Sequence, residues 1–226
     1  MRQWQVQDVM TTDVVTVGVE TPYRAIVGLL AERGVSGVPV VDESGRVQGV
    51  VSESDLLAKV EFTGQPEPRL FVGRRQRVAR THAVASVAEQ LMTAPAITVV
   101  RSTVLTTAAK LMDGERVKRL PVVDDLGRLE GIVSRSDLLK VYLRPDADIR
   151  ADVVDDVLRR VLSIEEGVVR VAVRDGVVSL RGRVDRRSTA QIAVRLGYAV
   201  PGVVDVTDRL EYAYDDVEVV GTGMIA

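Results

Sequence analysis

Short apolar runs alternate with polar turns along most of this chain, and one such pattern occurs twice. Leu120 to Val123 is an apolar run, an acidic turn containing Gly127 follows it, and Arg128 to Val133 is again rich in β-branched residues. Two such runs separated by a turn predict a β-hairpin, and the polar residues from Ser134 onward predict the start of a helix. The same succession occupies Val38 to Leu57, 82 positions earlier.

The two occurrences are copies of one unit. From position 39 to 57, 13 of 19 residues are identical to those 82 positions later, whereas unrelated segments match at roughly one position in fifteen. The agreement extends upstream, because Met10-Thr11 and Thr16-Val17 recur as Met92-Thr93 and Thr98-Val99. Each copy therefore predicts the order strand, helix, strand, strand, helix. Two copies favour a pseudo-twofold pair of α/β units over a longer array.

Helical periodicity supports this order in the first copy. Pro22 to Arg33 predicts an amphipathic helix with Ile26, Leu29 and Leu30 on one face, and Val14 to Val17 predicts the strand before it.

The C-terminal third has a different pattern. Apolar residues recur at helical spacing from Ile149 to Leu162, and Ser188 to Val200 predicts a second helix. Between them, Asp175-Gly176 is a strong two-residue hairpin turn joining two alternating segments. The expected strands are Val169 to Val173, Val177 to Val184 and Val203 to Leu210. The pattern predicts a small αββαβ unit that folds separately.

A connector without periodicity separates the two copies. It contains Pro66 and Pro68, then five arginines between Arg69 and Arg80 with no acid among them. These arginines are either a solvated linker or a strip that binds phosphates or a partner, and both interpretations stay open. The predicted organisation is a first copy at 1–60, a linker at 61–84, a second copy at 85–143, a third unit at 146–212 and a flexible tail at 213–226.

The composition argues against several kinds of chemistry. A net charge of −2 over 226 residues gives no electrostatic case for nucleic acid or an anionic membrane. The absence of cysteine removes thiol nucleophiles and thiolate metal sites, and the single histidine, His82, cannot form a histidine cluster. We therefore expect no enzyme, no catalytic residues, no metal and no required cofactor. The lack of a signal sequence or a long apolar run predicts a soluble, cytoplasmic protein.

The repeated Ser-x-Ser-Asp sequence is the main candidate for binding chemistry. Ser52 to Asp55 and Ser134 to Asp137 both fall where a strand passes into a helix. An Asp at a helix start can accept the paired hydroxyls of a ribose. The alternative is a capping box, which stabilises a helix by about 1 kcal/mol without any ligand.

The repeated motifs resemble a tandem pair of CBS domains, also called a Bateman module. Each copy has Met-Thr, Thr-Val, a hydrophobic-Pro-Val-Val-Asp segment and Gly-x-Val-Ser-x-Ser-Asp-Leu-Leu, and the resemblance covers residues 5 to 142. It implies two clefts that bind AMP, ADP, ATP or S-adenosylmethionine, with the Asp holding the ribose and the Ser assisting it. The implied ligand-binding residues are Thr16, Gly37, Val38, Ser52, Asp55, Thr98, Lys118, Arg119, Leu120, Ser134 and Asp137.

The two copies differ in charge before the proline. Arg116, Lys118 and Arg119 stand in the second copy where the first has Gly34, Ser36 and Gly37. Such basic pairs resemble those that hold phosphates in nucleotide-binding members of the family, through charge-assisted hydrogen bonds. The alternative is a solvated cluster favoured by the dipole at a helix end.

Residues 146 to 210 resemble a BON domain. The resemblance rests on the segment from Asp175 to Gly182 and on Val200 to Val206, and it implies binding of phospholipid or a partner protein. A group of arginines in this unit would either face anionic groups or form a solvated strand edge. These residues are Arg181, Arg183, Arg186 and Arg187.

Three functions compete. The first is a regulatory sensor that binds an adenine nucleotide in the paired copies and acts through the third unit or a partner. The second is a scaffold whose paired copies are structural and whose third unit binds phospholipid or protein. The third, nucleic-acid binding through the linker arginines, is weakened by the near-neutral charge and few aromatics.

A homodimer is the expected assembly. CBS pairs usually form a disc of four units with twofold symmetry. The candidate apolar helix faces are Ile26, Leu29 and Leu30 in the first copy and Leu111 and Met112 in the second.

Overall fold

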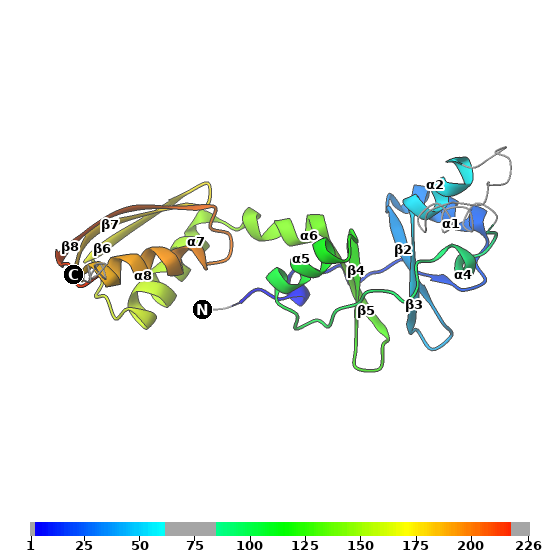
Figure 1. The fold of residues 1–226 in the computed structure, drawn as a ribbon, viewed down its shortest axis with the longest axis horizontal. Coiled ribbons are helices and arrows are strands. Elements are labelled where there is room, and N and C mark those ends of the chain that lie inside the picture. Colours follow the sequence, from blue (N-terminus) through cyan, green and yellow to red (C-terminus); the bar gives the residue numbers. More distant parts are fainter. Residues whose placement is uncertain (1–2, 62–84, 218–226) are drawn as a thin grey trace, which may run out of the picture. The chain divides into compact units, whose positions relative to one another are not determined.

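The computed structural model describes residues 3–61 and 85–217, which form two compact units (Figure 1). The first unit runs from Gln5 to Leu138 and contains both copies; the second contains Leu139 onward together with Trp4. The linker arginines and His82 lie outside the described residues. Within the described ranges, no helix is both long enough and apolar enough to cross a membrane.

The first copy has the predicted order of elements. Its elements are η1 (Val6–Asp8), β1 (Val17–Gly18), α1 (Tyr23–Arg33), β2 (Gly37–Val41), β3 (Val47–Ser52) and α2 (Glu53–Glu61). The first strand is shorter than predicted, because only Val17 and Gly18 pair with β2. Pro22, with φ −66° and ψ 148°, stands at the N-cap of α1, since its extended backbone ends the preceding loop.

The second copy repeats this arrangement. Its elements are α4 (Ala88–Leu91), α5 (Leu105–Gly114), β4 (Arg119–Val123), β5 (Leu129–Ser134) and α6 (Arg135–Leu139). The strand expected before α5 is reduced to one parallel bridge between Val99 and Val122. Both hairpins have the same register, with Gly37 opposite Ser52 and Arg119 opposite Ser134. The repeat is therefore structural as well as sequential.

The two copies exchange their lead-in segments. Met10 packs on Gly131 of the second copy, where a Cβ would lie 2.9 Å from the methionine sulfur. Met92 packs in the same way on Gly49 of the first copy, where the distance would be 2.6 Å. The following threonine completes each crossing, because Thr93 N–H donates to the Val50 carbonyl at 2.9 Å. Each hairpin is thus covered by a segment of the other copy.

The second unit has the predicted αββαβ order. Its elements are η2 (Lys140–Leu143), α7 (Asp146–Asp152), the π-helix η3 (Val153–Val161), β6 (Val169–Arg174), β7 (Val177–Arg186), α8 (Arg187–Tyr198) and β8 (Asp205–Tyr214). The sheet order is β6-β7-β8, antiparallel across the predicted turn and parallel between β7 and β8. Its core is valine-rich, with Val153, Val157 and Leu180 among the buried residues.

Strand β8 extends into the segment that the sequence predicted as a flexible tail. Strand β8 continues to Tyr214 because β7 extends to Arg186 and pairs with it along its whole length. Asp216 is also held, since the Ser188 hydroxyl and N–H donate to its carboxylate at 2.6 and 2.9 Å. Residues 213–217 therefore belong to the ordered unit.

The helix faces predicted for dimerisation are mostly internal. Ile26 is 0% exposed, Leu30 6% and Met112 1%, because these side chains fill the core of their own copy. The two most exposed large apolar residues described in the first copy lie on α2, where Leu57 is 60% and Val60 70% exposed.

Candidate functional site

Both Ser-x-Ser-Asp sequences form helix caps. In the second copy, the Ser134 N–H and hydroxyl donate to Asp137 Oδ2 at 2.9 and 2.6 Å. In the first copy, Ser52 makes the same pair of bonds to Asp55 Oδ2, at 2.8 and 2.7 Å. These bonds satisfy an N–H group at the helix start that would otherwise lack a partner. The cap also holds each aspartate, half-buried, at the wall of a cleft.

Two clefts lie between the copies. The one we name the Asp137 cleft has a volume of about 490 Å³ and the other, the Asp55 cleft, about 430 Å³. Both volumes suit a small-molecule ligand. The Asp137 cleft is lined by Thr11, Asp13, Val14, Val15, Gly34, Val35, Ser36, Gly37, Lys118, Arg119, Ile132, Ser134, Arg135, Ser136 and Asp137. The Asp55 cleft is lined by Ser36, Val50, Ser52, Glu53, Ser54, Asp55, Thr93, Pro95, Ala96, Ile97, Arg116, Val117, Lys118 and Arg119.

Each cleft combines the aspartate of one copy with the loop of the other. Asp137 faces the segment from Gly34 to Gly37, and Asp55 faces the segment from Arg116 to Arg119. The sequence motifs group each aspartate with the loop of its own copy, and Lys118 and Arg119 do line the Asp137 cleft, but the structure adds the loop of the other copy to each cleft. The physical reason is the packing of the two copies against each other, which brings segments 82 positions apart together.

Arg119 is shared by the two clefts. Its Nη1 donates to the Gly37 carbonyl at 2.6 Å and its Nη2 donates to the Ser36 hydroxyl. Gly37 permits this approach, because a Cβ there would lie 2.5 Å from Nη1. Burial lowers the pKa of the Arg119 guanidinium, and the charge of Glu53 opposes that shift. The cation is thus held between the copies, within reach of either cleft.

One further pair of equivalent residues distinguishes the clefts. Arg135 lines the Asp137 cleft, and Glu53 occupies the equivalent position in the Asp55 cleft. Arg135 is anchored by bonds of 3.3 Å from its guanidinium to the carbonyls of Val117 and Met112. The Asp137 cleft therefore has the more favourable charge for an anion at this position.

Four of the expected site residues do not line either cleft. Val38 and Leu120 are buried in the core, and Thr16 and Thr98 are half-buried and follow the lining residues Val15 and Ile97 in the chain. The remaining seven line one cleft or both: Gly37, Ser52, Asp55, Lys118, Arg119, Ser134 and Asp137.

The apolar wall of each cleft comes from residues that the motifs did not single out. Val14 and Val15 line the Asp137 cleft, and Ala96 and Ile97 line the Asp55 cleft. All four are half-buried and lie just before the threonines at positions 16 and 98. The sequence signal that could have identified them is the pair of apolar residues that follows each Met-Thr by a few positions.

A duplicated βαββα unit with two clefts between its copies, followed by an αββαβ unit, defines a tandem two-cleft module with an appended domain. Residues 6–61 and 87–144 match the CBS domain family, and residues 145–214 match the BON domain family. The chain therefore belongs to the CBS domain family and carries a C-terminal BON domain.

Similar proteins occur in Methanopyrus kandleri and in Arabidopsis thaliana. An uncharacterised protein from Methanopyrus kandleri is 32% identical over 146 residues, covering 62% of this chain and 64% of that protein. The chloroplastic CBS domain-containing protein CBSX2 from Arabidopsis thaliana is 33% identical over 128 residues, covering 51% of this chain and 53% of that protein. The match thus spans less than two thirds of either relative.

A solved structure resembles the paired copies. The crystal structure of CBSX2 in complex with AMP covers 62% of this chain and 97% of that chain, with 32% identity and a TM-score of 0.55.

Proposed function

We propose that the CBS pair is a sensor that binds an adenine nucleotide or a related adenosyl ligand, with no catalytic role. The observation that carries this proposal is the composition of the clefts. Each joins a capped Ser-Asp pair from one copy to apolar residues of the other copy, and each is also lined by the basic residues Lys118 and Arg119. The AMP complex of CBSX2 supports an adenosyl ligand for such a module.

Each part of the Asp137 cleft suits one part of a nucleotide. The Asp137 carboxylate can accept the ribose hydroxyls, because an ionised carboxylate offers about four acceptor sites. Val14 and Val15 provide an apolar surface for the base. Lys118 and Arg119 supply cations for the phosphates through charge-assisted bonds.

The two clefts compete for the shared guanidinium of Arg119. A phosphate that binds Arg119 in one cleft removes that cation from the other. The two linings have the same net charge, because Asp13 lines only the Asp137 cleft and Arg116 only the Asp55 cleft. Arg135 stands next to the capped Ser-Asp pair where the Asp55 cleft has Glu53, and on this ground we infer that the first phosphate-bearing ligand binds the Asp137 cleft. We infer that nucleotide binding at one cleft weakens binding at the second.

The output of the sensor lies in the BON domain or a partner protein. The BON domain folds around its own core, so it can act as a separate binding unit.

Thermal unfolding with AMP, ADP, ATP and S-adenosylmethionine tests the sensor. At least one of these ligands should raise the melting temperature of the wild-type protein. Asp137→Ala and Asp55→Ala should each lower the melting temperature of the free protein by a few degrees, because each loses a cap worth about 1 kcal/mol. Only Asp137→Ala should remove the shift at low ligand concentration, because a lost acceptor costs about 1–3 kcal/mol, or roughly tenfold in affinity.

The scaffold function makes the opposite prediction. If no adenine nucleotide shifts the wild-type protein at millimolar concentration, and none is carried through purification, the sensor proposal fails. If both variants keep the full ligand shift, the two aspartates are caps and the binding site lies elsewhere.

A further inference from the structure

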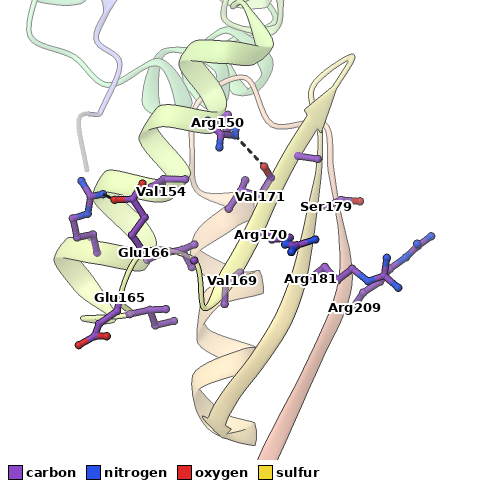
Figure 2. Close-up of a pocket in the computed structure, with 15 residues that line it drawn as sticks. Arg150, Val154, Glu165, Glu166, Val169, Arg170, Val171, Ser179, Arg181 and Arg209 are labelled. Atoms are coloured by element: carbon purple, nitrogen blue, oxygen red, sulfur yellow. Dashed lines mark hydrogen bonds and ion pairs between the residues drawn. The ribbon is translucent and has the colours of Figure 1, made fainter.

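Three arginines form a row across the sheet of the BON domain. Arg170 lies opposite Arg181 in the antiparallel pair β6–β7, and Arg181 lies opposite Arg209 in the parallel pair β7–β8. All three are exposed, whereas the neighbouring Val171 and Leu180 point into the core. Figure 2 shows the three side chains gathered at the same level of the sheet.

This row has no counter-ion within residues 3–61 and 85–217. None of its three guanidiniums makes an ion pair there, whereas Arg159 and Arg187 of the same domain hold carboxylates at 2.8 and 2.9 Å. Neighbouring strands are about 5 Å apart, so three like charges lie close together. Like charges directly opposite each other destabilise a sheet, so the row works against folding unless an anion binds it.

Acidic residues flank the arginine row on both sides along the sheet. Glu211 lies opposite Arg183 beyond one side of the row, and Asp205 lies on β8 beyond the other. Between Asp205 and the arginine row, Ser179 lies opposite Thr207, and this pair provides hydroxyl groups. A flat anionic membrane would meet these carboxylates as well as the arginines. The arrangement therefore favours a compact anion over a membrane surface.

The arginine row borders a cavity of about 630 Å³ (Figure 2). Arg150, from α7, also lines it and donates from Nε to the Val171 carbonyl at 3.0 Å. That bond occupies a carbonyl at the open edge of β6, which disfavours addition of a peptide strand there. Val154, Glu165 and Glu166 line the cavity on the helix side of β6, whereas the arginine row lies on the other side of that strand (Figure 2). A ligand of the row therefore binds at the solvent face of the sheet.

We propose that Arg170, Arg181 and Arg209 form a binding site for a soluble oligophosphate. The guanidinium fork matches phosphate oxygens in a bidentate manner, and three forks in a row can hold two or more linked phosphates. This site is separate from the nucleotide clefts, because all its residues belong to the BON domain.

Calorimetric titration of the full chain with inorganic tripolyphosphate tests this site. The control is Arg183→Gln, which removes the same charge from the same strand and face but lies opposite Glu211. Arg181→Gln should weaken tripolyphosphate binding by about tenfold or more, and Arg183→Gln by less than about threefold. The melting temperature of free Arg181→Gln should equal or exceed that of the wild type, since a repulsion is removed.

Several results would overturn the site. They are absence of tripolyphosphate binding, equal weakening by the two substitutions, or a lower melting temperature of Arg181→Gln that accounts for its loss of binding. Co-sedimentation with phosphatidylglycerol vesicles provides the remaining comparison. Vesicle binding that depends on Arg181, with no binding of tripolyphosphate, would assign the row to a lipid headgroup instead.

Discussion

Asp137 Oδ2 accepts two hydrogen bonds from Ser134, and the same carboxylate lies in the wall of a cleft. The sequence presented capping and ligand binding as alternatives, but the geometry is compatible with both. The cap fixes the carboxylate before any ligand arrives, so binding loses less side-chain freedom. The equivalent Asp55 is held in the same way.

At the same scale, Arg119 should control how the two clefts share a nucleotide. We expect calorimetry with ATP to show a second binding event at least about tenfold weaker than the first, because one guanidinium cannot serve both phosphate groups fully. Arg119→Ala should weaken the first event and bring the two affinities closer, while adenosine binding changes little.

Arg24→Ala provides the control, since Arg24 is exposed on α1 and lines neither cleft. Two equal and independent ATP sites in the wild-type protein would contradict the sharing of Arg119.

The pair Tyr198 and Asp205 should give the BON domain a pH-dependent contribution to stability. The Tyr198 hydroxyl donates to Asp205 Oδ1 at 2.6 Å, which lowers the pKa of Asp205 from 3.8 and raises that of Tyr198 from 10.0. The contribution of the carboxylate is present above pH 3.8 and is lost as the pH falls through its lowered native pKa. The contribution of the phenol is present below pH 10.0 and is lost as the pH rises through its raised native pKa.

Tyr198→Phe should therefore lower the melting temperature most at neutral pH, with the difference from wild type narrowing at both extremes. Melting temperature measured against pH for both proteins checks this. A difference in melting temperature between the two proteins that stays constant from acid to alkaline pH would show that the bond contributes nothing to the pH dependence of stability.

Among the elements, the hairpins β2–β3 and β4–β5 depend on close approach by the lead-in segment of the other copy. Gly131 lies against Met10 and Gly49 against Met92, at distances that leave no room for a Cβ. Glycine is required here for space, because neither position has a positive φ. The exchange of segments is what joins the copies into one unit.

Gly131→Ala should destabilise the CBS pair by about 1–3 kcal/mol, because the added methyl group would overlap the Met10 sulfur and the Thr11 carbonyl. Thermal unfolding should show a fall of several degrees. Gly28→Ala is the matched control, since nothing lies within 4 Å of its Cβ position on α1. That control should stabilise by about 0.4–1 kcal/mol, and a loss of equal size in both variants would contradict the packing argument.

For the whole molecule, the exposed apolar residues of α2 identify a candidate dimer surface. Leu57 is 60% and Val60 70% exposed, and burial of a leucine contributes about 1.5–3 kcal/mol. A homodimer through the CBS pair would cover them.

Sedimentation velocity at tens of micromolar should show a dimer for the wild-type protein and a monomer for Leu57→Glu. Leu126→Glu is the control, because Leu126 is 57% exposed on the turn between β4 and β5. It should remain dimeric. A wild-type monomer, or equal dissociation of both variants, would contradict this assembly.

Local residue patterns were enough to predict the hairpins, the helix starts and the duplication. Turn chemistry at Asp175-Gly176 and at the two acidic turns, with β-branched runs on either side, is enough to specify hairpins, because neighbouring residues decide them. The Ser-x-Ser-Asp sequence likewise specified two helix starts. The extent of β8 and the brevity of β1 were not predictable, since the length of a strand depends on the strand beside it.

The tertiary structure decided which residues share a site. No local pattern places Asp137 beside Gly37, or Arg119 between two clefts, because those contacts arise when two separately patterned copies pack together. The row formed by Arg170, Arg181 and Arg209 has the same origin. Each arginine is an ordinary exposed residue of its own strand, and only the pairing of three strands aligns their charges.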